Sequence, residues 1–219
     1  MAAQRKKKKS TQNLYGQEMG NKGAATREKI LSATAMLMKK RTLRDLKVSE
    51  IVTAAGVSSS TFYLYFQSVQ QAALAVTEEI NQSSPKVMEI LNREWTRENV
   101  HANSLELLKA YFAFWDEHSA VLRLRNFAAD EGDRDFYNSR RRSVEPIHFA
   151  LQEKILQFQP TEDGVAGLHA PSTASVLLAM LERTAAVVQL PSVHKATRPR
   201  QIEAAAFLVA STMVCVRDI

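Results

Sequence analysis

Apolar positions recur along most of the chain with the period of an α-helix. A first stripe, at i, i+3, i+7 and i+8, predicts an amphipathic helix from Thr26 to about Lys40. It consists of Ile30, Ala33, Leu37 and Met38. A second, at i, i+3, i+4 and i+7, predicts a short helix over 48–55. It consists of Val48, Ile51, Val52 and Ala55. From Ser68 onward no convincing alternating strand interrupts the helical period, so the pattern predicts an all-α fold.

The segment AAGVSSSTFYLYF, residues 54–66, has the composition of a tight connection between two helices. Gly56 is expected to end the second helix, because glycine enters the left-handed region without a Cβ penalty. Ser58 is expected to begin a third helix by accepting a hydrogen bond from the backbone N–H of Ser60 or Thr61. With Phe62 and Phe66 turned inward, one turn apart, the outward face carries hydroxyls, one aromatic ring and no acid. This face consists of Ser59, Ser60, Tyr63 and Leu64.

Helix breakers divide the rest of the chain into about six helices. They lie at Pro85, around Gly132, at 160–167, and at Pro171, Pro191 and Pro199. One of these helices, 103–118, is rich in large apolar side chains at helical spacing. They are Leu105, Leu108, Tyr111, Phe112, Phe114 and Trp115.

Charge is distributed unevenly along the chain. Its 219 residues are 45% hydrophobic, enough for a sizeable core, and carry a formal net charge of +6. Residues 1–29 hold this whole excess, and the body is neutral. Residues 1–24 combine Arg5–Lys9 with polar residues and glycines, so we expect a disordered basic arm that seeks a polyanion, unless it is a solubilising leader without a role. With no apolar run long enough for a membrane span or a signal peptide, a cytoplasmic location is expected, where Cys215 stays a reduced core residue.

The short turn alone leaves two interpretations open. Two short helices joined by a glycine turn are either an ordinary packed hairpin or a DNA-binding helix-turn-helix. In the second case the third helix enters the major groove, where serine hydroxyls approach base edges and the phenols of Tyr63 and Tyr65 reach phosphate oxygens. The first alternative makes the chain a helical small-molecule-binding protein or enzyme with an N-terminal scaffold. A membrane-surface protein that uses the lysine arm is a further rival.

The segment KVSEIVTAAGVSSSTFYLYFQS resembles the helix-turn-helix of the TetR/AcrR family of bacterial transcriptional regulators. The family pattern is Ala-Gly-Val-Ser, two variable residues and Thr-Phe-Tyr-x-Tyr/His-Phe, and the match runs from Thr26 to about Val76. The resemblance implies a helix-turn-helix domain over 25–70 and a larger helical effector-binding and dimerisation domain over 71–219. Two residues depart from the pattern. Lys47 stands where a Thr or Ser usually caps the second helix, and Val69 stands where a Lys usually meets phosphate.

Combining the residues with the resemblance gives the predicted DNA contacts. They are Arg27, Lys47, Ser58, Ser59, Ser60, Thr61, Tyr63, Leu64 and Tyr65. The partner is a double-stranded, pseudo-palindromic operator. The basic arm is expected to add affinity without specificity by following the DNA backbone or a minor groove.

The aromatic residues of the larger domain suggest two roles, core packing in a helical bundle or the walls of an apolar effector cavity. The predicted ligand contacts are Phe112, Trp115, Phe127, Phe149, Met180 and Arg183. Arg123, Arg125 and Arg140 to Arg142 either receive an anionic effector, such as an acyl-CoA head group, or form a solvated face. Glu182 and Arg183 fit an interfacial salt bridge or rim, or the orientation of a ligand.

Broad apolar surfaces over about 173–190 and 200–217 predict that these two helices form a homodimer, as the resemblance also implies. Catalysis and metal binding find little support, because the histidines lack metal-ligand spacing and DEGDRD at 130–135 lacks a distal Glu. No cofactor is expected. The resulting hypothesis is a homodimeric, sequence-specific transcriptional regulator, a repressor released from its operator by a small apolar effector of acyl or aromatic character.

Overall fold

A computed structural model describes residues 12–81, 85–158, 169–187 and 197–214. Within these ranges the chain is built from helices, with one isolated antiparallel bridge between Gln12 and Glu18 and no strand. The helices are α1 (Asn21–Met38), α2 (Val48–Ala55), α3 (Ser59–Tyr65), α4 (Val69–Asn81), α5 (Pro85–Leu91), α6 (Val100–Asp130), α7 (Arg134–Phe158), α8 (Ala170–Val187) and α9 (Arg198–Val214). The predicted all-α fold is confirmed, and the predicted helix 48–55 has the bounds of α2.

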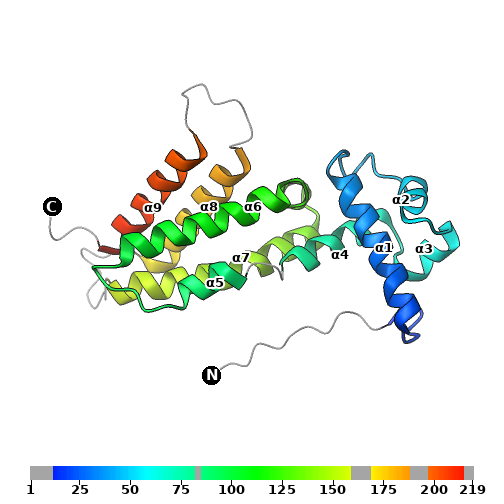
Figure 1. Cartoon of the computed structure of the whole chain (residues 1–219), viewed down its shortest axis with the longest axis horizontal. Coiled ribbons are helices and arrows are strands. Elements are labelled where there is room, and N and C mark those ends of the chain that lie inside the picture. The colour runs from blue at the N-terminus through cyan, green and yellow to red at the C-terminus, as the bar shows by residue number, and fades with distance from the viewer. Residues whose placement is uncertain (1–11, 82–84, 159–168, 188–196, 215–219) are drawn as a thin grey trace.

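The helices form two groups joined by α4. Helices α1 to α3 pack together at one end of the molecule, and α5 to α9 form a bundle at the other (Figure 1). In this bundle α6 packs along α9 and α7 packs along α8. The helix expected over 103–118 is part of a much longer helix, most of it in the N-terminal half of α6, because the apolar stripe continues to Ala129.

The small group is stabilised by a core that reaches beyond its own helices. Ile30 of α1, Ile51 of α2 and Phe62 of α3 are fully buried together. The same cluster includes Val121 of α6 and Phe136 of α7, and the C-terminal half of α6 contributes three further residues to it. These are Leu124, Ala128 and Ala129. The first three helices therefore rest on the larger domain through continuous apolar packing.

The larger group has its own core, built around the N-terminal half of α6. Phe112 and Trp115 are buried there with Trp95, Leu151 of α7 and Met213 of α9. The guanidinium of Arg198, at the start of α9, lies 4.4 Å from the centre of the Phe112 ring. Of the two roles suggested for these aromatics, Phe112 and Trp115 have the packing role in this structure.

The proposed breakers mark helix starts and ends. Pro85 is the first residue of α5, and Pro171 and Pro199 are the second residues of α8 and α9. Proline is tolerated at these positions, because the N–H groups of the first helical turn have no partner within the helix. α6 ends before Gly132, whose φ of 95° favours glycine. Pro146 lies inside α7, which continues through it. The breakers at 160–167 and Pro191, together with Cys215, lie outside the described residues.

A buried polar network holds the C-terminal end of α4 to the larger domain. Arg125 Nη1 donates to Asn81 Oδ1 at 2.8 Å and to Ser143 Oγ at 2.7 Å. Asn81, the last residue of α4, also donates to Ser139 Oγ of α7 at 3.1 Å. Glu182 of α8 stands 3.7 Å from Arg125 Nη2 and accepts from Arg140 Nη2 at 2.7 Å.

This network corrects two expectations about the charged residues of the larger domain. Arg125 is buried, so it does not belong to a solvated face, and Glu182 is buried too rather than lying at a rim. Burial lowers the pKa of the Arg125 guanidinium to about 10, against the opposing attraction of Glu182. The sequence could not show this arrangement, because the pair comes from helices far apart in the chain.

Candidate nucleic-acid interface

The turn between α2 and α3 has the predicted local geometry. Gly56 adopts left-handed angles, φ 65° and ψ 39°, and the N–H of Val57 donates to the carbonyl of Val52 at 3.0 Å. Ser58 is extended, and its Oγ accepts a hydrogen bond from the N–H of Thr61 at 3.1 Å. The prediction that Gly56 ends one helix and Ser58 caps the next is confirmed. This sequence folds as a tight turn because glycine tolerates positive φ and serine satisfies an end N–H of α3.

The surface of α3 divides as expected between a buried and an exposed side. Phe62 and Phe66 lie in the core, whereas Tyr63 is 47% and Leu64 41% exposed. Ser58, Ser59 and Ser60 are exposed, and the segment Ser59–Tyr65 contains no acidic residue. The hydroxyl of Ser58 lies 2.8 Å from those of Ser60 and Thr61. The first turn of α3 is therefore a compact patch of hydroxyl groups.

Two of the predicted DNA contacts hold α3 in place within the protein. Arg27 is half-buried, pairs with Glu79 of α4 at 3.3 Å and lies 5.5 Å from the centre of the Phe66 ring. Tyr65 is half-buried, and its hydroxyl lies so close to Gly23 of α1 that a Cβ there would stand 3.4 Å from it. Tyr65 was expected to point outward. It packs inward because the N-terminal end of α1 passes beside it.

The two departures from the family pattern have visible consequences. Lys47 is the N-cap of α2 and makes no side-chain capping hydrogen bond, as expected of a cation that cannot accept one. Its side chain is exposed. Val69, at the start of α4, is buried in the core of the small group. An apolar side chain replaces a cation at this position, so this residue serves packing.

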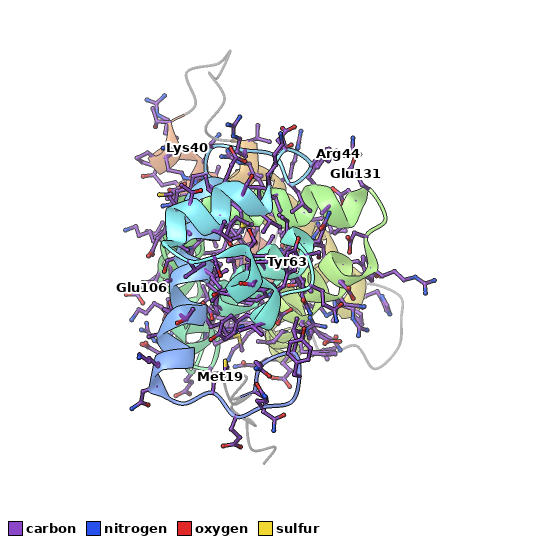
Figure 2. The ribbon with its side chains drawn as sticks, turned by 90° about the vertical axis from the view of Figure 1, so that its right-hand side faces the viewer. Met19, Lys40, Arg44, Tyr63, Glu106 and Glu131 are labelled. Carbon is purple, nitrogen blue, oxygen red and sulfur yellow. The ribbon has the colours of Figure 1, made fainter. Side chains whose placement is uncertain are left out.

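The connection between α1 and α2 is a basic loop that the sequence reasoning overlooked. Residues 39–47, KKRTLRDLK, carry five basic side chains and one acid. Lys39 and Lys40 are exposed, Arg41 pairs with Glu50 at 3.2 Å, and Arg44 contacts Glu131. Figure 2 looks onto the end of the molecule formed by α1 to α3, with Lys40 and Arg44 at the upper edge of the view and Tyr63 near its centre. The signal was visible in the sequence as a local charge run.

Residues 12–20, expected to belong to a disordered arm, form an ordered turn instead. Asn13 Oδ1 accepts from the N–H groups of Tyr15 and Gln17, both at 3.0 Å, and Gly16 has a φ of 77°. α1 then begins at Asn21, five residues before the predicted start. The turn is held by hydrogen bonds of the Asn13 side chain and of the backbone, and none of its residues is buried. Arg5 to Lys9 lie outside the described residues.

The predicted ligand contacts do not surround one cavity. Phe112 and Trp115 are buried, but Phe127 is 61% and Phe149 53% exposed. Phe127 lies about 120° around α6 from Trp115, so the two face different neighbours. Met180 is half-buried and Arg183 is exposed. The spacing along a helix indicated large apolar residues without showing which face each occupies.

Two of the predicted ligand contacts line hollows in the larger domain. Trp115 borders a small cavity of about 30 Å³, with polar walls from Arg125, Asn81 and Glu182. Phe149 borders an open groove of about 480 Å³ between α7 and α8, with Leu178 and Ala179. Glu182 lines both. The groove has the size of a small-molecule site, whereas the inner cavity accommodates little more than water.

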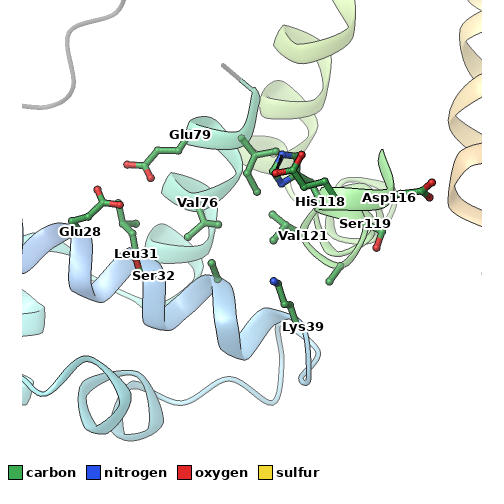
Figure 3. Close-up of a pocket in the computed structure, with 14 residues that line it drawn as sticks. Glu28, Leu31, Ser32, Lys39, Val76, Glu79, Asp116, His118, Ser119 and Val121 are labelled. Carbon is green, nitrogen blue, oxygen red and sulfur yellow. Dashed lines mark ion pairs between the residues drawn. The ribbon is translucent and has the colours of Figure 1, made fainter. Parts of the chain in front are cut away.

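A third hollow lies between the two groups of helices. It has a volume of about 610 Å³ and is formed by α1, α4 and the middle of α6 (Figure 3). Four carboxylates line it, together with one lysine and His118. They are Glu28, Glu79, Asp116 and Glu117. In the described part of the chain, no three His, Cys, Asp or Glu side chains are grouped closely enough to hold a metal ion.

The last two helices expose apolar side chains. Phe207 and Leu208 of α9 are 61% and 48% exposed, although Ala206, Val209 and Met213 of the same helix are buried. Val176 of α8 is 68% exposed. Among the described helices, none is both long and apolar enough to cross a bilayer.

Family models match both parts of the chain. Residues 30–76 match the model described as "Bacterial regulatory proteins, tetR family", and residues 87–211 match "Tetracyclin repressor-like, C-terminal domain". The second match covers more than half of the chain. The chain belongs to the TetR family. The resemblance noted from the helix-turn-helix is thereby confirmed.

Curated relatives of this chain are described as HTH-type transcriptional regulators. The chain is 31% identical over 115 residues to YdgC of Bacillus subtilis, an "Uncharacterized HTH-type transcriptional regulator", covering 52% of this chain and 59% of that protein. It is 27% identical over 97 residues to the "HTH-type transcriptional regulator EthR" of Mycobacterium tuberculosis, covering 43% and 44%. The chain thus spans about half the length of the curated relatives it matches. These proteins are described as transcriptional regulators, not as enzymes.

Solved structures share the fold at low identity. FadR from Bacillus subtilis, in complex with stearoyl-CoA, has a TM-score of 0.66 at 14% identity and covers 84% of this chain and 98% of that one. A tetR-family regulator from Streptomyces coelicolor has a TM-score of 0.64 at 18% identity, with 89% and 82% covered. At these identities the likeness shows the TetR fold alone.

Proposed function

We propose that this TetR-family regulator is a homodimeric repressor that binds a pseudo-palindromic operator through α3 and leaves it when a small apolar effector binds the larger domain. The observation that carries the DNA-binding part is the exposed, carboxylate-free surface of α3, at the same end of the molecule as the basic loop 39–47 (Figures 1 and 2). Phosphate is not repelled from such a surface, and the loop supplies cations beside it.

Within this proposal the exposed residues of the small group take distinct roles. Ser59 and Ser60, at the N-terminal end of α3, approach base edges, and Tyr63 donates its hydroxyl to a phosphate. Ser58 and Thr61 order the first turn of α3. Lys40 and Lys47 neutralise phosphates. Leu64 makes an apolar contact in the groove. Arg27 and Tyr65 act indirectly, because both pack α3 against α1 and α4.

Exposed apolar side chains support dimerisation through α8 and α9. Phe207, Leu208 and Val176 would each leave water in a two-fold interface between these helices. Such a dimer presents two copies of α3 to successive major grooves, about 34 to 36 Å apart. Size-exclusion chromatography with light scattering tests this: a dimer is expected for the wild type and a shift toward monomer for Phe207→Glu. A wild type that elutes as a monomer contradicts the proposal.

The effector part draws on the hollows of the larger domain and on its connection to α4. The α7/α8 groove, with Phe149 and Leu178, offers apolar walls for an acyl or aromatic molecule. A solved protein of the same fold holds stearoyl-CoA, which has a long acyl chain. An effector that favours a dimer geometry unsuited to the operator need supply a coupling of only about 1 to 3 kcal/mol, which lowers DNA affinity roughly 5- to 150-fold.

The DNA-binding experiment begins with selection of genomic fragments by the purified wild type. Affinity for a retained fragment is then measured for Tyr63→Phe, with Tyr137→Phe as the matched control, since Tyr137 is an exposed tyrosine of α7. Tyr63→Phe is expected to weaken binding at least about 10-fold per half-site, because a hydrogen bond to a charged acceptor is worth about 1.5 to 3 kcal/mol. Equal affinity of both variants and the wild type contradicts the role of α3.

Effector control is tested by reciprocity. Acyl-CoA thioesters and aromatic acids are screened for loss of the protein–DNA complex, and the affinity of an active compound is measured with and without the retained fragment. Linkage requires the DNA to weaken binding of that compound by the same factor by which the compound weakens DNA binding. An active compound that binds equally well in both cases acts by another route.

A further inference from the structure

The turn at residues 12–20 is attached directly to the end of α3. The N–H of Leu14 donates to the carbonyl of Leu64 at 3.1 Å. α3 ends at Tyr65, so this carbonyl belongs to the last turn, where carbonyls have no partner within the helix. On the other side of the turn, Met19 and the Tyr65 hydroxyl both lie close to Gly23. The turn and α3 therefore form one unit, joined through a backbone hydrogen bond and close packing.

The turn exposes one tyrosine, Tyr15, to solvent. The side chain of Tyr15 is 70% exposed, although its backbone N–H is fixed by Asn13 Oδ1. A single exposed aromatic residue is ordinary on a protein surface. The location of Tyr15 distinguishes it, because the adjoining residue Leu14 bonds to the same turn of α3 that exposes Tyr63 and Leu64. Met19, at the far end of the turn, lies below Tyr63 in the view of Figure 2.

The orientation of α3 suggests what this tyrosine meets. When the N-terminal residues of a recognition helix contact base edges, its C-terminal end lies toward the sugar–phosphate wall of the groove. Tyrosine hydroxyls are frequent donors to phosphate oxygens. We propose that the turn at residues 12–20 is a second DNA-contacting element, in which the Tyr15 hydroxyl donates a hydrogen bond to a phosphate beside the groove occupied by α3. The proposal rests on the DNA-binding function proposed above.

A neutral phosphate contact has a signature that separates it from the basic residues. A hydroxyl releases no counterion, so its removal weakens binding to every duplex by a similar factor and leaves the salt dependence unchanged. Loss of a lysine, in contrast, lowers the salt slope by about 0.9. The turn itself has no basic residue and one acid, Glu18. Its contribution is therefore separable from that of Arg5 to Lys9 by salt titration.

The experiment compares four variants of the full chain. Tyr15→Phe removes the hydroxyl, Tyr15→Ala removes the ring as well, Asn13→Ala removes the acceptor that fixes the turn, and Tyr137→Ala is the control for loss of an exposed tyrosine. Binding is measured at several salt concentrations to a genomic fragment retained by the wild type and to a random duplex of the same length. Circular dichroism checks that each variant retains its helix content.

Tyr15→Phe, Tyr15→Ala and Asn13→Ala are expected to bind both duplexes more weakly, by at least about 10-fold per contact and about 100-fold for a dimer on two half-sites, with an unchanged salt slope. Wild-type affinity of Tyr15→Phe overturns the hydroxyl contact, even if Tyr15→Ala is weaker. An equal loss in Tyr137→Ala also overturns it. If the wild type binds no duplex, the proposed function itself fails. If Tyr63→Phe weakens binding while all Tyr15 variants do not, only the inference about the turn fails.

Discussion

Replacing Glu182 by glutamine tests how the larger domain holds α4. The side chains of Glu182 and Arg125 are 9% and 3% exposed, so the substitution leaves a guanidinium in the core without its countercharge. Breaking a buried ion pair by removing one partner costs about 3 to 5 kcal/mol. We expect the lower end, about 3 kcal/mol, because Arg125 keeps hydrogen bonds to Asn81 and Ser143 and Arg140 keeps Asp130.

The expected result is a fall in the melting temperature of about 6 to 12 °C, since a domain of this size loses about 2 to 4 °C per kcal/mol. The assay is thermal and denaturant unfolding followed by circular dichroism at pH 7. Burial lowers the pKa of Arg125 to about 10, against the opposing attraction of Glu182. A buried ion pair generally stabilises little compared with apolar residues of the same volume, because both charges lose their hydration. The cost appears when one charge is left alone.

A double-mutant cycle gives the decisive comparison. Arg125→Met alone leaves Glu182 paired with Arg140 and is expected to lower the free energy of unfolding as well. The double variant, Arg125→Met with Glu182→Gln, should lose at least about 1 kcal/mol less than the sum of the losses of the two single variants. Additive losses would show that the two residues do not interact. A Glu182→Gln variant within about 1 kcal/mol of the wild type would refute the reasoning about the buried charge.

Three further predictions follow from single residues. Lys40→Ala, in the basic loop, should lower the slope of log affinity against log salt by about 0.9 per phosphate contact without altering the preference for a retained fragment over random duplex; an unaltered slope in a salt titration places Lys40 away from DNA. Gly56→Ala should lower the free energy of unfolding by about 1 kcal/mol in urea, because φ is 65° there while a Cβ would meet nothing within 4 Å; unchanged stability would contradict the strain argument. Burial raises the pKa of Tyr111, so the unfolded chain loses this proton first and wild-type stability has a component that falls above pH 10; Tyr111→Phe should lose less stability between pH 9 and pH 11, and parallel pH curves would refute it.

The parts of the fold that the sequence predicted are those determined locally. A left-handed glycine and a serine cap require only their own neighbours, so Gly56 and Ser58 were placed correctly by residue type. The stripe of α2 likewise predicted its bounds. The turn at 12–20 escaped prediction because it is held by the Asn13 side chain and by a hydrogen bond to Leu64, far away in sequence.

The orientation of the candidate ligand residues, in contrast, could not be predicted from local sequence. Phe112, Trp115 and Phe127 share α6, but a helix turns each residue toward a neighbour that only the tertiary arrangement determines. Phe127 is 61% exposed, whereas Phe112 and Trp115 of the same helix are buried. The Arg125–Glu182 pair depends on contact between α6 and α8, so no pattern of neighbouring residues in the sequence predicts it. In contrast, the charge run at 39–47 was visible in the sequence, and its basic residues before Lys47 could have been included among the DNA contacts.

The length of α6 gives the regulator a mechanical property. Its first half lies in the core of the larger bundle and its second half in the core beneath α1 to α3, within one uninterrupted helix of 31 residues. Ala129 lies about 26 Å along α6 from Phe112, so a tilt of about 5° at Phe112 moves Ala129 by about 2 Å. Repacking around Phe112 would therefore displace the part of α6 that packs beneath α1 to α3. Because α6 belongs to both cores, a small change in its tilt within the larger bundle becomes a larger displacement beneath α1 to α3.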